Sequence, residues 1–261
     1  ELIKLSNPDK EKKTIFVWPE GMFSSTYLNE IEKYKDIFSD SFSKNHIIVF
    51  GINNLVYVGD KEYVYNSLSV VDKNLNLLAN YNKNKLVPFG EFLPFENFLN
   101  KLGLKKITYG YRSFSKGNNR KIIKIKKDDY NLSFLPLICY EIIYSGNLKQ
   151  KTHKFNLIIN ISEDGWFGNS IGPHQHFVHA IYRAIEEGVY VVRSTNNGIS
   201  AFISPYGKIM NSLKPDEKGA IEVKIPKYEK NTIFSKYGNK IFFLIIFMYI
   251  FLILIFKKLE T

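Results

Sequence analysis

Short runs of apolar, β-branched residues alternate along the chain with segments in which apolar residues recur at helical spacing. The runs are bounded by Gly, Asn, Asp, Ser or Lys, as is typical of strands. We predict strands at Thr14 to Trp18, Ile47 to Asn53, Tyr63 to Asp72, Leu75 to Asn82, Leu132 to Cys139, Leu157 to Ser162, Val189 to Ser194, Ile199 to Ser204 and Ala220 to Ile225.

Two segments between these runs have the three-to-four-residue spacing of an amphipathic helix. The first extends from Ser25 to Phe42, where Ser24 and Ser25 are candidate N-caps. The second extends from His176 to Glu187, and Gly188 stands where a C-terminal glycine usually ends a helix. Because strands and helices alternate, the fold class is predicted to be α/β.

The C-terminal segment Ile241 to Phe256 contains no charged residue and is flanked by lysines on both sides. It is slightly shorter than the ~17 to 25 residues of a usual spanning helix, but flanking lysines extend the reach by snorkelling. A buried core helix is the alternative, but a soluble helix of this length normally has a polar face, and this segment has none. We therefore predict a folded domain over residues 1–232 and a membrane anchor over residues 233–261.

The charges around this anchor predict its orientation. Lys257 and Lys258 follow the apolar segment and favour a cytoplasmic C-terminus, which places the preceding domain outside the cytoplasm. The first residue is Glu1 rather than Met, so we expect the chain to be part of a longer protein with further membrane segments.

Composition excludes several classes of protein. A hydrophobic share of 45% and an aromatic share of 15% exclude a disordered or fibrous chain. The single cysteine excludes an internal disulfide and any cysteine-rich metal site.

The net charge of +11 is scattered along the chain, and its densest cluster extends from Arg120 to Lys127. Ile123 and Ile125 alternate there with basic residues, which predicts a lysine-protected strand at a sheet edge. A membrane-facing patch is the alternative. No nucleic-acid-binding motif accompanies the charge, so we expect no nucleic-acid partner.

Three chemically reactive side chains follow predicted strands. In open α/β sheets, reactive groups gather at the carboxyl ends of strands, where Glu20, Lys83 and Cys139 stand here. A thiol is only a few per cent thiolate at neutral pH, so a nucleophilic cysteine needs a base or a nearby cation. Glu20 is a candidate base, and Lys83 is a candidate donor to an oxyanion. A buried, inert cysteine is the alternative.

The histidines His174, His176 and His179 cluster after the Gly172-Pro173 turn. They lack a carboxylate at regular metal-ligand spacing, so structural or lining roles are favoured over a metal site.

Five stretches of the chain carry a resemblance to a known family: Trp18-Pro19-Glu20, Tyr81 to Phe92, Ile138 to Glu141, Asn160 to Gly172 and Arg193 to Gly198. In these stretches the sequence resembles the nitrilase superfamily and, within it, the apolipoprotein N-acyltransferases. The resemblance implies a nitrilase-like α-β-β-α sandwich followed by a C-terminal transmembrane helix. It also implies that Glu20 is the general base, Lys83 the oxyanion-stabilising cation and Cys139 the acyl-carrying nucleophile.

The resemblance implies roles for further residues. Glu91 and Glu141 match supporting acids that hold the lysine and the pocket in register, with surface or salt-bridging glutamates as the alternative. Tyr140 and Trp166 match positions near the substrate, although packing is an equal interpretation. The chain departs from the family pattern in carrying a lysine at Lys85 and an acid at Glu163.

Four phenylalanines recur at every third position beside the predicted lysine: Phe89, Phe92, Phe95 and Phe98. They are candidates for a lipid-facing lid, with Phe89 and Phe92 as substrate-binding residues. Packing into the core is the alternative.

These observations together predict a membrane-anchored acyltransferase. Cys139 would take a fatty acyl group from a phospholipid as a thioester and pass it to the amine of a diacylglyceryl-cysteine on an apolipoprotein. The resemblance places such an enzyme in the bacterial inner membrane, as a multi-pass protein with its catalytic domain on the periplasmic side, and implies no metal or organic cofactor. A membrane-tethered amidase that delivers the acyl group to water is the alternative. A scaffold without catalysis is disfavoured by the intact Glu, Lys and Cys.

Overall fold

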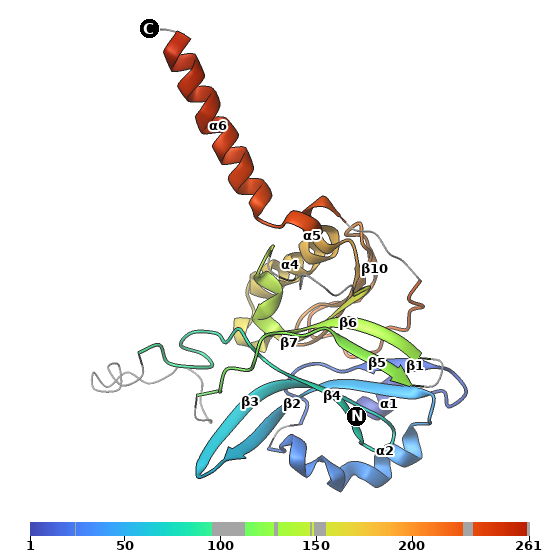
Figure 1. The fold of residues 1–261 in the computed structure, drawn as a ribbon. Coiled ribbons are helices and arrows are strands. Elements are labelled where there is room, and N and C mark those ends of the chain that lie inside the picture. Colours follow the sequence, from blue (N-terminus) through green and yellow to red (C-terminus); the bar gives the residue numbers. More distant parts are fainter. Residues whose placement is uncertain are drawn as a thin grey trace.

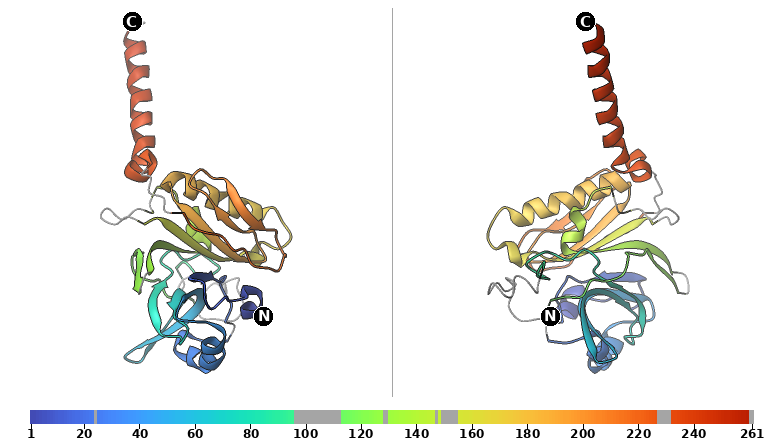
Figure 2. Two further views of the ribbon diagram at one scale, coloured as in Figure 1. Left: turned by 90° about the vertical axis from the view of Figure 1, so that its right-hand side faces the viewer. Right: turned by 60° about the vertical axis from the view of Figure 1, so that its left-hand side comes forward.

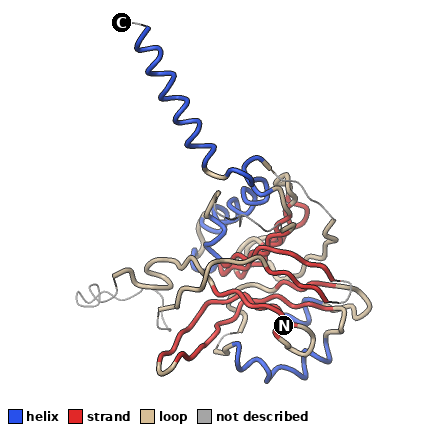
Figure 3. Tube along the Cα trace, viewed as in Figure 1, coloured by secondary structure: helices blue, strands red, loops and turns tan. Residues whose placement is uncertain are grey.

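The structure is a computed structural model, which describes residues 1–23, 25–95, 113–127, 130–146, 148, 155–226 and 232–259. Two β-sheets lie face to face, and helices cover the outer face of each sheet (Figure 1). The tube coloured by secondary structure shows the same layers (Figure 3). The predicted α/β fold class and the α-β-β-α sandwich are thereby confirmed.

The first sheet contains strands in the order β1-β2-β3-β4, with β1 parallel to β2 and the remaining pairs antiparallel. Its strands are β1 (Thr14–Val17), β2 (His46–Val58), β3 (Lys61–Val71) and β4 (Leu77–Asn82). The helices on its side are α1 (Leu2–Ser6), the 3-10 helix η1 (Leu28–Tyr34) and α2 (Lys35–Ser41). Aromatic side chains fill this layer, including Trp18 against Phe38 and Phe50.

The second sheet has the order β10-β9-β8-β7-β6-β5, with β6, β7 and β8 parallel. Its strands are β5 (Ile123–Lys127), β6 (Tyr130–Ile138), β7 (Leu157–Glu163), β8 (Tyr190–Asn196), β9 (Ser200–Ile203) and β10 (Ile209–Leu213). Helix α4 (Gly172–Glu187) covers its outer face with Phe177, Ala180 and Ala184. As predicted, α4 ends at Gly188, whose φ of 66° requires the left-handed region that glycine adopts freely.

The main core lies between the two sheets, where alternate residues of facing strands interdigitate. From the first sheet it takes Ile47, Val49, Leu68 and Val70, and from the second Phe134, Ile138, Ile159 and Ile161. This packing holds the carboxyl ends of β1 and β6 at one side of the molecule, where the candidate site forms.

Two predicted elements need correction. Residues 220–226 do not form a strand, because they are largely exposed and pair with no strand among the described residues, whereas β10 was not predicted. The helical segment begins at Leu28 rather than at Ser25, because the Glu30 carboxylate accepts the Tyr27 N–H at 3.0 Å and caps the turn there. Ser25 is therefore not the cap, and Ser24 lies outside the described residues.

The predicted basic edge strand is confirmed as β5, which among the described strands pairs only with β6. Ile123 and Ile125 are buried, whereas Lys124 and Lys126 are exposed. The alternation thus places lysines along the sheet edge, where they oppose pairing with another chain.

The C-terminal segment forms α5 (Ile233–Tyr237) and α6 (Lys240–Leu259), and α6 projects away from the sandwich in every view (Figure 2). Its 18-residue window Lys240–Lys257 has a mean hydropathy of 2.5 and none of it is buried. The alternative of a buried core helix is therefore wrong. At 1.5 Å per residue this window is about 27 Å long, close to the hydrocarbon thickness of a bilayer.

The two residues before this helix, Gly238 and Asn239, contact the loop that follows the 3-10 helix η2 (Cys139–Ile143). Asn239 Nδ2 donates to Ser145 O at 3.3 Å. Gly238 has a φ of 54°, and a Cβ at this position would lie 2.7 Å from Gly146 O, so a side chain there has no room. The start of α6 is therefore held directly against the sandwich.

Deletion of residues 240–261 should move the chain from the membrane fraction to the soluble fraction, because α6 exposes apolar side chains on all sides. Alkaline extraction of membranes followed by centrifugation measures this partition. As a control, replacing Lys257 and Lys258 by glutamine should leave the chain in the membrane pellet. A truncated chain that pellets unchanged would show that the main membrane attachment lies elsewhere.

Candidate active site

Cys139 stands at the sharp turn between β6 and the 3-10 helix η2 (Cys139–Ile143). Its φ of 49° lies in the left-handed region, which costs a non-glycine residue of order 1–3 kcal/mol. A strained turn of this kind between a strand and a helix presents the nucleophile at the end of the sheet in α/β-hydrolases. The thiol is free and the residue is partly exposed.

Glu20 follows β1 and points to the same end of the sandwich. One carboxylate oxygen accepts from Asn66 Nδ2 at 2.6 Å, and the other accepts from the Glu163 N–H at 2.9 Å. Gly51 of β2 allows this approach, because a Cβ there would lie 2.6 Å from Glu20 Cα. The first sheet, through Asn66, and the second sheet, through Glu163, thus fix one oxygen each of this carboxylate.

Lys83 follows β4 and is fully buried at 1% exposure. Its Nζ forms an ion pair with Glu91 Oε1 at 2.8 Å, and its N–H donates to Asn66 O at 2.8 Å. Asn66 Nδ2 also donates to Glu91 Oε1 at 3.0 Å. Asn66 therefore connects the lysine, its counter-ion Glu91 and Glu20, a link that was not predicted from the sequence.

The electrostatics of the site show that the three candidate residues lie together. Burial, followed by the charge of Glu20, raises the pKa of the Cys139 thiol to about 12, against the opposing effects of Lys83 and a hydrogen bond with Ser162. Burial also raises the pKa of Glu20, although Lys83 opposes it. Burial alone would lower the pKa of Lys83, but the charges of Cys139, Glu20 and Glu91 raise it.

These shifts define what the site can do. The thiol keeps its proton at neutral pH and needs a base beside it, and a carboxyl with a raised pKa accepts a proton more readily than an ordinary one. Lys83 stays an ammonium, positioned to stabilise negative charge in a water-poor environment. Sequence reasoning placed these groups at strand ends, and the structure brings Glu20, Lys83 and Cys139 together.

Glu141 lies on η2, two residues after Cys139, and is completely buried. It is a hydrogen-bond acceptor for several segments: Tyr81 OH at 2.7 Å, Lys85 N at 3.0 Å, Asn84 N at 3.1 Å and Ile138 N at 3.0 Å, with Arg120 Nη2 at 3.3 Å. Glu141 is therefore not a surface glutamate, although it does form the salt bridge that was the other alternative, with Arg120. Its contacts join the turn at Cys139 to the loop that follows Lys83.

The predicted substrate-binding aromatic residues differ in their environment. Trp166 on the 3-10 helix η3 (Asp164–Phe167) is 70% exposed, so its interpretation as a packing residue is wrong. Phe89 and Phe95 are also exposed, at 47% and 85%, which rules out core packing for both. Phe92 is half-buried.

Two of the aromatic positions remain to be placed. The Tyr140 ring packs edge-on against Tyr144, with ring centroids 6.2 Å apart. Phe98 lies outside the described residues. Substrate binding by Phe89, Phe92, Tyr140 and Trp166 stays a prediction.

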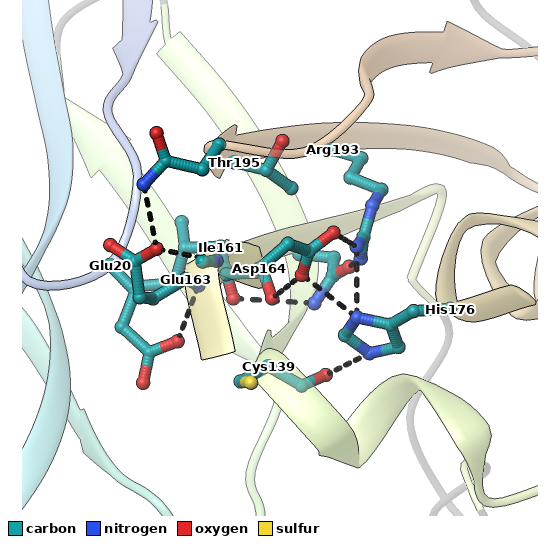
Figure 4. Close-up of polar contacts among 12 residues, drawn as sticks. Glu20, Cys139, Ile161, Glu163, Asp164, His176, Arg193 and Thr195 are labelled. Carbon is teal, nitrogen blue, oxygen red and sulfur yellow. Dashed lines mark hydrogen bonds and ion pairs between the residues drawn. The ribbon is translucent and has the colours of Figure 1, made fainter. Parts of the chain in front are cut away.

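A buried polar cluster, not predicted from the sequence, lies beside the turn at Cys139 (Figure 4). Its members come from β7, η3, α4 and β8: Asn160, Ser162, Asp164, His176 and Arg193. The detectable signal in the sequence was a polar or charged residue inside two apolar strand runs, Asn160 and Arg193.

Of the three clustered histidines, only His176 belongs to this buried group, whereas His174 is exposed. A structural or lining role for these histidines stays a prediction. Within the described residues, no three His, Cys, Asp or Glu side chains are grouped to hold a metal ion.

Comparison with known proteins places the chain in a family context. The family model for carbon-nitrogen hydrolases matches residues 16–232. The apolipoprotein N-acyltransferase of Rickettsia prowazekii (strain Madrid E) is 40% identical over 210 residues, covering 80% of this chain and 40% of the relative. That of Bradyrhizobium diazoefficiens is 36% identical over 229 residues, covering 87% of this chain and 42% of the relative. The chain thus spans about 40% of the length of these relatives.

Solved structures share the fold at low sequence identity. Saccharomyces cerevisiae Nit3, a member of branch 10 of the nitrilase superfamily, is 18% identical with a TM-score of 0.53, covering 78% of this chain and 74% of Nit3. A mutant amidase from Nesterenkonia sp. AN1, with the acetamide moiety of fluoroacetamide added covalently at its active-site cysteine, is 14% identical with a TM-score of 0.51. This match covers 77% of this chain and 74% of the amidase.

Proposed function

The chain belongs to the carbon-nitrogen hydrolase family, and from this premise we propose that it is the catalytic part of a bacterial membrane N-acyltransferase that matures lipoproteins. The observation that carries the proposal is the meeting of Glu20, Lys83 and Cys139 on three strand ends of the sandwich. The similarity to apolipoprotein N-acyltransferases over most of this chain supports the choice of reaction.

In the first half-reaction, Cys139 Sγ attacks the carbonyl carbon of a phospholipid acyl ester. Glu20 takes the thiol proton as the carbon–sulfur bond forms, because the thiol with its raised pKa does not ionise alone. The Lys83 ammonium stabilises the negative oxygen of the tetrahedral intermediate. The ester carbon–oxygen bond then breaks, and the departing lysophospholipid oxygen takes the proton from Glu20.

In the second half-reaction, the amine of a diacylglyceryl-cysteine attacks the thioester carbon. Glu20 accepts a proton from the attacking nitrogen as the carbon–nitrogen bond forms. The carbon–sulfur bond breaks, and the Cys139 thiolate takes the proton back. The products are an N-acylated lipoprotein and the free enzyme, so no other reactant is required.

The surroundings of the site support a lipid substrate. Phe89 and Phe95 are exposed on the loop that follows Lys83, where apolar rings would contact acyl chains. The base of α6 is packed against the loop after η2, so a membrane-inserted helix would hold the site at the bilayer surface. In this arrangement residues 1–232 are the catalytic domain and residues 233–261 the anchor, in an inner membrane with the domain on the periplasmic side.

Water is the competing acceptor, because a thioester can be hydrolysed as well as aminolysed, and an amidase shares the fold. The acyl-enzyme should hydrolyse slowly alone and discharge quickly when a diacylglyceryl-cysteine peptide is added, since a transferase must exclude water and hold the amine close. The measurement loads the chain with phospholipid carrying a labelled acyl chain and follows loss of label from the protein.

The matched control is the same peptide with its amine acetylated, which should discharge nothing because the nucleophile is blocked. Rapid release of free fatty acid, at a rate indifferent to the peptide, would contradict the transferase and favour the amidase.

A further inference from the structure

The buried cluster beside Cys139 contains an ion pair between Asp164 and Arg193. Arg193 Nη2 donates to Asp164 Oδ2 at 2.8 Å, and Arg193 Nη1 donates to Asn160 Oδ1. Ser162 Oγ donates to Asp164 Oδ1 at 2.7 Å. Asp164 and Arg193 are both essentially inaccessible to solvent, so this ion pair is a fixed support for the residues around it.

His176 connects the Asp164–Arg193 ion pair to Cys139 (Figure 4). Its Nδ1 lies 2.9 Å from Asp164 Oδ1 and 3.1 Å from Arg193 Nη2. Its Nε2 lies 3.3 Å from the carbonyl oxygen of Cys139. A carbonyl oxygen only accepts hydrogen bonds, so this bond requires the proton on Nε2. In the neutral ring Nδ1 then accepts from Arg193 Nη2, and only the imidazolium also donates from Nδ1 to Asp164.

The carbonyl that His176 contacts belongs to the peptide group between Cys139 and Tyr140, so this contact also sets the direction of the Tyr140 N–H. The peptide between Cys139 and Tyr140 is planar and trans, so its carbonyl and the Tyr140 N–H point to opposite sides. Fixing the oxygen toward His176 therefore fixes the Tyr140 N–H away from it. In hydrolases with a strained nucleophile turn, the N–H after the nucleophile donates to the oxyanion.

The strain at Cys139 makes an external hold necessary. A φ of 49° persists in a non-glycine residue only where its surroundings determine it. The cluster contacts Cys139 at its backbone, because His176 Nε2 meets the Cys139 carbonyl, and the Ser162 side chain acts to lower the pKa of the thiol. Ser162 Oγ is in turn hydrogen-bonded to Asp164, and His176 Nδ1 lies against Asp164 and Arg193.

We propose that His176 is a positioning residue for acyl transfer: it holds the Cys139 carbonyl and so aims the Tyr140 N–H at the oxyanion of the tetrahedral intermediate. The proposal rests on the proposed function, in which Cys139 is the nucleophile. His176 acts through the peptide and touches no substrate atom. Its removal should therefore slow steps that build an oxyanion and leave other reactions of the thiol nearly unchanged.

Two substitutions separate the two ends of the ring. The amide nitrogen of glutamine reaches the position of Nε2, so His176→Gln keeps a donor to the Cys139 carbonyl. The shorter His176→Asn reaches only the position of Nδ1 and loses that donor while keeping a polar contact with Asp164. His174→Asn, at an exposed position of the same helix, is the matched control.

Two reactions of the full chain in detergent with added phospholipid are measured for each variant. Acylation of Cys139 builds an oxyanion, whereas alkylation of the thiol by iodoacetamide does not. We expect His176→Asn to lower the acylation rate roughly 10²-fold, as loss of alignment at a reacting centre does, with alkylation changed by less than about threefold on the same argument. His176→Gln should recover most of the acylation rate, and His174→Asn should match the parent chain.

The outcomes separate this inference from the proposed function. Equal acylation by His176→Asn and the parent, with Cys139→Ala inactive, overturns the positioning role and leaves the function standing. Acylation and alkylation that fall together in both His176 variants, with a lowered melting temperature, also overturn it, because the role is then purely structural. An acyl adduct that survives in Cys139→Ala contradicts the proposed function itself.

Discussion

Replacing Cys139 by alanine should abolish formation of a hydroxylamine-labile acyl adduct, because the atom that forms the thioester is removed. The chain contains one cysteine, so any thioester on it must involve Cys139. The measurement incubates the chain with phospholipid bearing a labelled acyl chain and detects label on the protein before and after hydroxylamine.

Serine provides the matched variant for this experiment. Cys139→Ser retains a side chain of similar size at the same strained backbone position, and any ester it forms resists neutral hydroxylamine, so label that survives the treatment marks the altered bond. Both variants should melt within a few degrees of the parent chain, since neither removes a charge or a large buried side chain. A labile adduct on the alanine variant would exclude Cys139 as the acyl carrier.

Replacing Lys83 by alanine should have the second largest effect. Loss of one oxyanion donor lowers the rate about 10²- to 10³-fold. The same change leaves the Glu91 carboxylate without its ion-pair partner in a buried setting, and breaking a buried pair in this way costs about 3–5 kcal/mol of folding free energy. Acylation rates and thermal unfolding are therefore measured on the same preparation, at a temperature where the variant is folded.

Lys85 is the control for this prediction, because it lies two residues away and is exposed. Its Nζ is 5.8 Å from the centroid of the Tyr144 ring, a contact worth about 0.5–1 kcal/mol at an exposed site. Lys85→Ala should retain most of the acylation rate and of the stability. If Lys85→Ala is inactive while Lys83→Ala acylates normally, the assignment of the oxyanion donor is shifted by two residues.

Local patterns in the sequence were sufficient for the α/β class and for the reactive groups at strand ends, whereas the layered sandwich was expected only from the family resemblance. A strand buried between two layers carries an apolar run whatever its partner, and an apolar segment between lysines needs no tertiary context to be recognised. For this reason the strands that carry Glu20, Lys83 and Cys139, the edge strand β5 and the helix α6 were all predicted.

The sequence was insufficient to predict elements that depend on a contact with another part of the chain. The alternation at residues 220–226 matches a strand, but a strand forms only where another strand accepts its hydrogen bonds. The start of the helical segment depended on a single contact between Glu30 and Tyr27.

The amino-acid sequence by itself determined which reactive side chains are available for the proposed acyl transfer and which strand ends they follow. Tertiary structure alone decided their environment. Asn66 meets Glu20 across 46 positions of the chain because β1 and β3 both pair with β2, and Arg193 meets Asp164 across 29 positions because β7 pairs with β8. Protonation depends on burial and on neighbouring charges in space, so the raised pKa of the thiol and the hold of His176 on its carbonyl exist only in the folded sandwich.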